Sequence, residues 1–460
     1  MAEPAPGRLT VDALRRLVAE GAIDTVIAAM VDMQGRLVGK RVTGRFFVDE
    51  IARDGMHACS YLLACDVDME PLPGYRLTSW ATGYHDVWLR PDLGTMRRLP
   101  WLPGTALVLC DVCDEGGAPV EESPRQVLQR QVERAQALGF SPLVASELEF
   151  YLFRDTYEQA RRKHYHDLEP YGQYIEDYHI LQGTKEEWLV RQIRNGLEAA
   201  DVPVEFSKGE WGPGQHEINL RYTTPVEMAD RHTLYKHGAK EIAALNGVSL
   251  TFMAKWRPDA AGSSFHLHSS VWDRDGRRNL FWEEGAAPLG MSATFRHYLG
   301  GQLAGARPLA YFFAPYINSY KRYMAGTFAP VLAVWSHDNR TCGFRVVGDG
   351  RSLRVENRIP GADANPYLAF AATIAAGVWG IERRLEPPAM FEGDAYQAEG
   401  LPRVPATLRE ATGELDRSEL ARAAFGDRVV EHYVHTARLE QDLFDHAVTC
   451  WELNRNFERI

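Results

Sequence analysis

The sequence has little cysteine, no long apolar run and no excess of positive charge, and each shortage excludes a class of protein. Its six cysteines are spread over 460 residues, too few for a disulfide framework. The longest uncharged apolar stretch, residues 367–381, is shorter than the roughly 20 residues that a membrane-spanning helix needs. The first residues also lack the apolar segment of a secretory signal. We therefore expect a soluble, cytoplasmic protein that does not bind membranes.

The charge balance argues against a nucleic-acid partner. Lys and Arg total 51 against 62 Asp and Glu, which leaves a formal net charge of −11, the wrong sign for a polyanion binder. The glycine-rich phosphate loop of P-loop NTPases is absent from the sequence. With 45% apolar and 25% charged residues, the composition is typical of a globular protein, and a small-molecule enzyme fits it best.

Local patterns predict two domains and an α+β fold. Thr10 is a suitable N-cap for a helix that ends at Gly21, and residues 23–30 and 36–42 flank a turn of the kind that closes a β-hairpin. Residues 106–112 read as a buried strand ending at Cys110 and Cys113, the only close cysteine pair, which we expect to be buried thiols. We place the boundary near residue 115, which gives domains 1–115 and 116–460.

Two helices are predicted in the second part of the chain. Ser123 and Pro124 suit the start of a helix over residues 125–138, because serine accepts hydrogen bonds from free amides and proline fits the first turn. Asn365 precedes a second helix, residues 366–381, which is apolar on nearly every face. Such a helix is expected to be buried inside a large domain.

Three short segments alternate apolar residues with ionisable ones. Because side chains of a strand point alternately to its two faces, each segment presents one apolar face and one charged face. The charged faces carry Glu147 and Glu149 in residues 146–153, His266 and His268 in residues 264–272, and Arg354, Glu356 and Arg358 in residues 353–359. One such segment fits a solvated edge strand, but three together indicate a shared site.

A fourth segment, residues 210–217, adds Glu210 and Glu217 across a Gly- and Pro-rich turn. Carboxylates gathered at this density raise one another's pKa unless cations neutralise them, and an oxygen-rich set with one or two imidazoles suits Mg²⁺ or Mn²⁺. Basic residues follow in the same half of the chain: Lys321, Arg322, Arg340, Arg345 and Arg358. Carboxylates that hold metal beside arginines suggest phosphoryl transfer.

Several motifs resemble, in their order, those of the glutamine synthetase family, and they cover nearly the whole chain. They are Ser-Glu-Leu-Glu-Phe-Tyr-Leu-Phe (146–153), Gly-Gln-His-Glu (214–217), Gly-Ser-Ser-Phe-His-Leu-His (262–268), Asn-Ser-Tyr-Lys-Arg (318–322), Asn-Arg-Thr-Cys-Gly-Phe-Arg (339–345), Arg-Val-Glu-Asn-Arg (354–358) and Asn-Pro-Tyr-Leu-Ala-Phe (365–370). The resemblance implies an N-terminal β-grasp domain and a catalytic domain with an antiparallel strand funnel surrounded by helices. It also implies a dodecamer of two hexameric rings with active sites between subunits.

The resemblance assigns roles residue by residue. One metal site would be Glu149, Glu210 and Glu217, and the other Glu147, His266 and Glu356, with two or three Mg²⁺ or Mn²⁺ per active site. ATP would be held by Tyr222, His268, Ser270, Arg345, Arg354 and Lys208, and L-glutamate by Gly262, Arg322, Arg340 and Arg358. Arg322, Arg340 and Arg345 would be catalytic. The γ-carboxylate of glutamate would take the γ-phosphoryl group of ATP, and an amine would then displace phosphate.

The sequence departs from the ammonia-using members at the acceptor site. Where they carry a glutamate in the loop after Asn-Ser-Tyr-Lys-Arg, this chain has Phe328, and residues 55–60, which match their second ammonium anchor loosely, contain no acid. An alkylamine gains roughly 0.8 kcal/mol per buried methylene against an apolar wall. We therefore expect an organic amine as acceptor, either a monoamine such as ethanolamine or methylamine or a polyamine, in a pocket that includes Phe328, Tyr61 and Trp80, as in the γ-glutamylamide and γ-glutamylpolyamine synthetases.

Two alternatives and one gap stay open at this stage. Beside the amine ligase, one alternative is a true glutamine synthetase with altered ammonium handling. The other, least in keeping with the intact ligand set, is an idle family member that serves as a binding or structural protein. The base that deprotonates the amine is not identified by the sequence. His57 lies in the loosely matched segment and is a candidate, although a lone histidine is more often structural.

Overall fold

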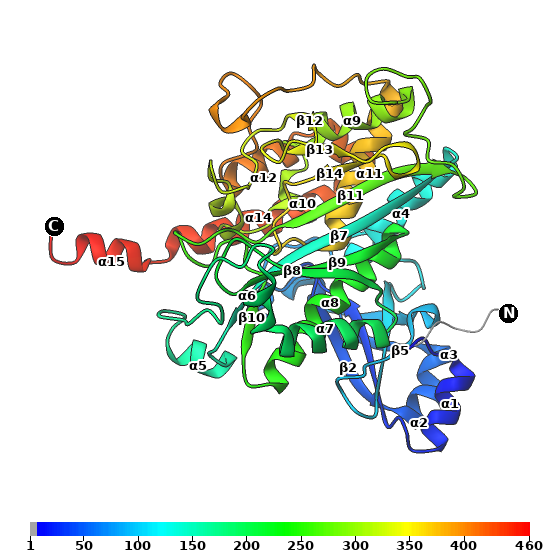
Figure 1. The fold of residues 1–460 in the computed structure, drawn as a ribbon. Coiled ribbons are helices and arrows are strands. Elements are labelled where there is room, and N and C mark those ends of the chain that lie inside the picture. The colour runs from blue at the N-terminus through cyan, green and yellow to red at the C-terminus, as the bar shows by residue number, and fades with distance from the viewer. Residues whose placement is uncertain (1–6) are drawn as a thin grey trace.

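Two β-sheets organise the computed structural model, which describes residues 7–460 (Figure 1). The first sheet has the order β2-β1-β6-β4-β3, with β5 paired to β6. Its strands are β1 (Thr25–Val31), β2 (Leu37–Thr43), β3 (Met56–Cys59), β4 (Asp86–Pro91), β5 (Arg97–Arg98) and β6 (Thr105–Cys113). Short helices accompany it: α1 (Val11–Ala19), α2 (Gly44–Phe46) and α3 (Ala52–Asp54).

The second sheet has the order β12-β13-β14-β11-β7-β9-β8, with β10 paired to β7. Its strands are β7 (Phe140–Phe153), β8 (Val204–Gly209), β9 (Gln215–Thr223), β10 (Ser249–Thr251), β11 (Phe265–Asp273), β12 (Trp335–His337), β13 (Phe344–Val347) and β14 (Arg354–Asn357). All pairs except β12 with β13 are antiparallel. The two sheets use residues 25–113 and 140–357, while the exact boundary near residue 115 stays a prediction.

Helices flank the second sheet and continue to the C-terminus. They are α4 (Pro124–Ala137), α5 (Tyr157–Arg162), α6 (Ile180–Thr184), α7 (Glu187–Ala199), α8 (Pro225–Leu245), α9 (Ala293–Gly305), α10 (Ala310–Phe313), α11 (Pro366–Arg383), α12 (Leu408–Asp416), α13 (Glu419–Phe425), α14 (Asp427–His446) and α15 (Cys450–Asn456). The expected α+β class is confirmed. Among the described residues, no helix is long and apolar enough to cross a membrane.

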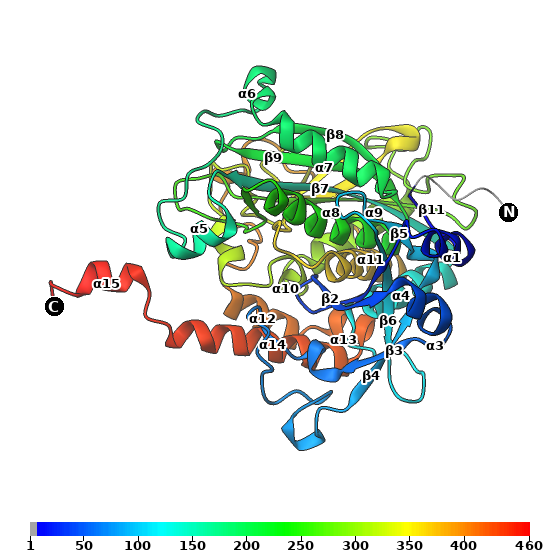
Figure 2. The same ribbon diagram turned by 90° about the horizontal axis from the view of Figure 1, so that it is seen from below.

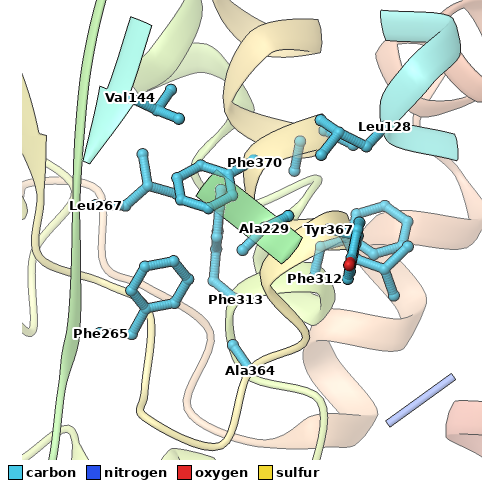
Figure 3. Packing of buried hydrophobic residues seen from close by; sticks show 14 of the residues in the cluster. Leu128, Val144, Ala229, Phe265, Leu267, Phe312, Phe313, Ala364, Tyr367 and Phe370 are labelled. Carbon is cyan, nitrogen blue, oxygen red and sulfur yellow. The ribbon is translucent and has the colours of Figure 1, made fainter. Parts of the chain in front are cut away.

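The main core lies between the second sheet and helices α4, α8 and α11. Phe265 and Leu267 point from β11 toward Phe370 of α11, and Leu128 of α4 closes the cluster (Figure 3). The rings of Phe265 and Phe370 lie 5.5 Å apart in an edge-to-face arrangement. One face of the sheet is therefore fixed by packing, and its opposite face is left to the ionisable side chains.

The predicted local signals are confirmed with one correction. The Thr10 side chain accepts a hydrogen bond from the Ala13 amide at the start of α1, and β1 pairs with β2 as a hairpin. Asn365 caps α11, which is buried along most of its length. Helix α4 starts at Pro124, one residue before the predicted range, and the Ser123 side chain makes no capping hydrogen bond, so the fixed backbone of Pro124 marks the start.

The two thiols at the end of β6 are buried, as expected. Both Cys110 and Cys113 are free, and burial raises the pKa of Cys110 to about 12. A thiol with so high a pKa stays protonated at neutral pH and is a poor metal ligand. The pair therefore belongs to the core of the first sheet.

Candidate functional site

Strand register brings the predicted acidic residues together on one face of the second sheet. Glu147 of β7 lies opposite His266 of β11, and Glu149 of β7 lies opposite Glu217 of β9. Glu356 of β14 lies opposite His268 of β11. Because alternate residues share a face, the apolar partners Leu148 and Leu267 point to the core, where both are fully buried. The period of two in the sequence thus translates directly into a polar face.

A cavity of about 270 Å³ opens over this face, and all six predicted metal ligands line it. They are Glu147, Glu149, Glu210, Glu217, His266 and Glu356. The predicted glutamate-binding residues Gly262, Arg322, Arg340 and Arg358 line the same cavity, together with Arg345 and Phe328. Side chains from widely separated strands and loops therefore converge as the sequence predicts.

Glu147, His266 and Glu356 form a compact group, with ligand atoms within 4.8 Å of one another. The Nδ1 atom of His266 lies 3.4 Å from Glu147 Oε2 and 3.7 Å from Glu356 Oε1. Burial, reinforced by the charge of Arg358, lowers the pKa of His266 to about 4. The imidazole is thus neutral at physiological pH, which is the form that binds a metal ion.

The second group is more crowded with negative charge. Glu149, Glu217 and His266 have ligand atoms within 4.8 Å of one another. Burial, and then the charge of Glu210, raises the pKa of Glu149 to about 7. Burial and three neighbouring carboxylates, Glu147 first among them, raise the pKa of Glu217 well above its ordinary value. Oxygen donors that repel one another in this way suit a divalent cation, which would hold them together.

Glu210 differs from the other predicted ligands because its carboxylate contacts Lys208. The two residues are two positions apart and so point to the same side of the chain. The Lys208 ammonium group also lies 4.5 Å above the ring of Tyr178 and 3.8 Å from Asp177. Lys208 therefore lies among the central-cavity residues, and its predicted contact with ATP stays a prediction.

Arginines meet the acidic residues on the side of β13 and β14. Arg358 and Arg345 donate to the two oxygens of Glu356, at 2.5 and 2.8 Å. Burial opposes ionisation of Glu356, but Arg358 and His266 outweigh it, and its pKa falls to about 2. Glu356 is therefore a permanent carboxylate. Its charge holds both guanidinium groups at the cavity wall.

Arg322 is buried and fixed by the backbone. Its Nη1 and Nη2 atoms donate to the carbonyls of Ile359 and Arg358, at 2.9 and 3.1 Å. A Cβ atom at Gly262 would lie only 2.6 Å from Cγ of Arg322, so glycine is required for this close approach. Gly262 and Arg322, both predicted to bind glutamate, therefore form one rigid corner of the cavity.

A second cavity of about 460 Å³ adjoins the first and shares Glu147, Phe206 and Asn219 with it. Four residues predicted to hold ATP line this second cavity: Tyr222, His268, Ser270 and Arg354. Arg354 Nε donates to His268 Nδ1 at 3.1 Å, which leaves the proton of His268 on Nε2, 2.8 Å from Glu147. A contact chain thus runs from the second cavity to the acidic cluster.

Phe328 lines the central cavity beside Trp211, with ring centroids 5.7 Å apart. Its side chain is half exposed, and its backbone has a positive φ of 57°, which is rare for a bulky residue. Arg358 donates to the Phe328 carbonyl at 3.3 Å and so ties this loop to β14. Of the three residues predicted for the acceptor pocket, Phe328 therefore lines the cavity, beside Trp211, which sequence reasoning missed; its contact with an acceptor stays a prediction.

Tyr61 and Trp80 lie apart from Phe328 within one chain. Tyr61 lines a separate cavity of about 500 Å³ beside His57, and Trp80 is largely exposed and packs edge-on against Tyr84. Neither residue, nor His57, lines the central cavity. Their predicted place in the acceptor site requires a neighbouring subunit and stays a prediction.

Sequence reasoning also missed residues that position the acids. Gln215 Nε2 donates to Glu149 Oε2 at 3.1 Å, and the Ser264 amide and hydroxyl donate to the same carboxylate at 2.7 and 2.5 Å. Gln215 lies two positions from Glu217 and Ser264 two positions from His266, within the family-like motifs, which is the signal available in the sequence. Asp177, also in the cavity, lies in an irregular segment with no such signal.

Comparison with known proteins gives consistent matches over nearly the whole chain. A family profile described as "Glutamine synthetase, catalytic domain" matches residues 121–456. The γ-glutamylethanolamide synthetase GlnA4 of Streptomyces coelicolor is 52% identical, over 98% of this chain and 96% of the relative. A glutamate–isopropylamine ligase of a Pseudomonas species is 36% identical, over 97% and 98%. A structure of GmaS in complex with ADP aligns with a TM-score of 0.84 at 26% identity, covering 97% of this chain and 99% of the other.

Proposed function

Because the chain belongs to the glutamine synthetase family, we propose that it is an ATP-dependent ligase that joins the γ-carboxylate of L-glutamate to an organic amine. The observation that carries the proposal is the central cavity, in which six potential metal ligands, four arginines and an aromatic wall meet. The likeness to amine ligases at 52% and 36% identity over nearly the whole chain supports the same reaction.

The nucleotide is assigned to the second cavity and glutamate to the central one. Tyr222, Ser270 and Arg354 line the second cavity, which meets the acidic cluster at Glu147. ATP bound there would direct its phosphates into the central cavity, where Glu147, His266 and Glu356 lie together with Arg340 and Arg345. Mg²⁺ or Mn²⁺, two or three per site, would be held by the six predicted ligands and would neutralise the charge of the phosphates.

The arginines supply fixed positive charge where negative charge develops. The γ-carboxylate of glutamate attacks the γ-phosphorus of ATP, the bond to the ADP oxygen breaks, and γ-glutamyl phosphate forms. Arg340 and Arg345 would stabilise the transferring group, while Arg322, Arg358 and Gly262 would hold glutamate. The neutral amine then attacks the acyl carbon and phosphate leaves. Glu356 keeps Arg345 and Arg358 in place throughout, since both donate to it.

The acceptor is proposed to be a small organic amine, with ethanolamine favoured. Phe328 and Trp211 provide apolar surface for its carbon atoms, each methylene contributing roughly 0.8 kcal/mol when buried. Asp177 lies in the same cavity and is proposed to hold the ammonium group of the incoming amine and to accept its proton. The relative at 52% identity is named for its ethanolamide product, which supports ethanolamine over larger amines.

A panel of acceptors tests the proposal. ATP-dependent phosphate release is measured with glutamate and, in turn, ammonium, methylamine, ethanolamine, isopropylamine, putrescine and spermidine. We expect the highest kcat/KM with ethanolamine, whereas a clear preference for ammonium would favour the glutamine synthetase alternative. Glu356→Gln serves as the inactive control. If neither wild type nor this variant releases phosphate with any amine, the alternative of an idle family member is favoured.

Assembly into a homo-oligomer, in the dodecameric form implied by the family, is part of the same proposal. Helix α15 projects from the body of the chain in two perpendicular views (Figures 1 and 2). Its segment exposes large apolar side chains, among them Val448, Trp451 and Phe457. Exposed apolar surface on a projecting helix supports contact with another subunit. Such contacts would also be the route by which Tyr61 or Trp80 could reach a neighbouring acceptor site.

A further inference from the structure

A buried cluster of ionisable residues lies apart from the six predicted metal ligands. It consists of Glu176 and Glu186, on the irregular segment and turn that precede α7, and His216 of β9. His216 follows Gln215 and precedes Glu217 on β9, so it points away from the face that carries Glu217. All three residues are at most 2% exposed, and their ligand atoms lie within 4.8 Å of one another.

The contacts of the cluster leave one oxygen unused. His216 Nε2 contacts Glu186 Oε2 closely and lies 3.8 Å from Glu176 Oε2. Glu176 Oε1 accepts a hydrogen bond from the Gly214 amide at 3.3 Å. Glu176 Oε2 is buried and has no hydrogen-bond partner. An oxygen of a carboxylate that is 99% buried thus points toward the imidazole with nothing bound to it, and such an atom is costly to bury.

The charge of the cluster is also unbalanced. Within residues 7–460, neither Glu176 nor Glu186 forms an ion pair with a lysine or arginine, and their only ionic contacts are with His216. Two carboxylates therefore face a single imidazole in a site shielded from water. A single divalent cation would cancel the charge and satisfy the unused oxygen.

We propose that Glu176, Glu186 and His216 bind a structural divalent transition-metal ion, with Zn²⁺ preferred. The donor set equals that of Glu147, His266 and Glu356, but here the residues are at most 2% exposed, whereas Mg²⁺ usually keeps several waters or phosphate oxygens in its shell and Zn²⁺ accepts as few as four ligands. The inference does not depend on the proposed ligase reaction, because the site lies on the other face of β9 from Glu217.

Close packing around Glu176 indicates what the ion would stabilise. A Cβ atom at Gly172 would lie 2.2 Å from Glu176 Oε1, and one at Gly209 would lie 2.5 Å from Glu176 Cβ. Both glycines therefore leave space for this one side chain. Asp177 and Tyr178, which follow Glu176 directly, line the central cavity. The ion would anchor that wall of the cavity to β9 and to the start of α7.

Metal analysis of purified full-length protein tests the proposal. Wild type, Glu176→Gln, Glu186→Gln and the control Glu187→Gln are treated with EDTA, separated from it by gel filtration and measured by inductively coupled plasma mass spectrometry. Glu187 is a suitable control because it adjoins Glu186 but is partly exposed and pairs with Arg194. We expect about one zinc per chain in wild type and Glu187→Gln, and less than a tenth of that in the other two variants.

The competing arrangement balances the charge with protons: Glu176 is then protonated and His216 is charged. Glu176→Gln would mimic this state, so its melting temperature would match that of wild type, and wild type would neither contain zinc nor take it up on dialysis against micromolar Zn²⁺. That result overturns the proposal. If the variants fail to fold, anomalous diffraction from wild-type crystals at the zinc absorption edge decides. A peak among the three residues supports the site, and its absence after dialysis against Zn²⁺ rejects it.

Discussion

Replacing Phe328 with alanine tests whether its ring recognises the carbon atoms of the acceptor. The ring stands in the cavity against Trp211 and is half exposed, so one of its faces is available to a ligand. Removing it leaves Arg358, Glu356 and the other charged groups in place, since Arg358 contacts only the backbone carbonyl of Phe328. The substitution should therefore change amine affinity and leave the affinities for ATP and glutamate unchanged.

The size of the effect follows from the carbon count of the amine. Full burial of a methylene gains roughly 0.8 kcal/mol, and a ring that covers one side of the ligand supplies about half of that. The loss on removing the ring is then about 0.4 kcal/mol for methylamine, about 0.8 for ethanolamine and about 1.2 for isopropylamine. At 1.4 kcal/mol per tenfold change, kcat/KM should fall about 2-fold, 4-fold and 7-fold for the three amines, and not at all for ammonium.

The assay is phosphate release at saturating ATP and glutamate, with each amine varied. Phe46→Ala is the matched control, because Phe46 has a similar exposure of 44% but lies on α2, away from the cavity. The reasoning is refuted if the variant loses activity equally with all four acceptors, since the ring would then only hold the loop. It is equally refuted if the loss does not increase with the number of carbon atoms.

Three further predictions concern charge and metal. Glu356→Gln should lower phosphate release at least about 10³-fold in the same assay, because it removes a metal ligand and releases Arg345 and Arg358; residual activity within tenfold of wild type would contradict this. Asp177→Asn should raise the KM for ethanolamine about 10-fold, the loss of one charge-assisted contact, without changing the KM for ATP; an unchanged KM for ethanolamine would remove Asp177 from the acceptor site. Burial lowers the pKa of His432 to about 3, and since the unfolded imidazole has a pKa of about 6.5, the native state binds fewer protons between these values. The contribution of the neutral His432 to the free energy of unfolding is thus fully present above pH 6.5, and it falls by about 1.4 kcal/mol at pH 5.5. Urea unfolding at pH 7.5 and 5.5 should show this fall in wild type and not in His432→Asn.

The strand pattern predicted the acidic face because it depends only on local geometry. Glu147 and Glu149 share a face with a period of two, whatever the strand pairs with, and the same holds for His266 and His268. The register that sets Glu149 opposite Glu217 is a tertiary feature, yet the apolar alternation leaves few registers that bury the other face. Glu210 and Glu217 were found in the turn segment and Glu356 in the third alternating segment, and the family motifs then supplied the division into two metal sites.

Other parts of the site were beyond sequence reasoning for identifiable reasons. Asp177 reaches the cavity from an irregular segment, where no period indicates which side chains face inward. The contact of Lys208 with Glu210 was missed because Lys208 was assigned to ATP and Glu210 to a metal ion. Residues two apart in an extended chain nevertheless point to the same side. The positions of Tyr61 and Trp80 relative to Phe328 depend on assembly, which a single chain does not determine.

The distribution of protons in the acidic cluster explains how one cavity can exist both with and without metal. Glu356 stays ionised because two arginines contact it, whereas burial raises the pKa of Glu149 to about 7 and raises the pKa of Glu217 well above its ordinary value. These raised pKa values favour protonation of Glu149 and Glu217, which reduces the repulsion between β7 and β9 when no cation is bound. A metal ion bound there would have to displace these protons, so we expect the affinity of the Glu149 site to weaken as the pH falls below about 7. The group of Glu147, His266 and Glu356 would bind without this competition, because His266 is already neutral and Glu356 already charged. The two halves of the cluster should consequently fill in a fixed order, with the arginine-supported half first.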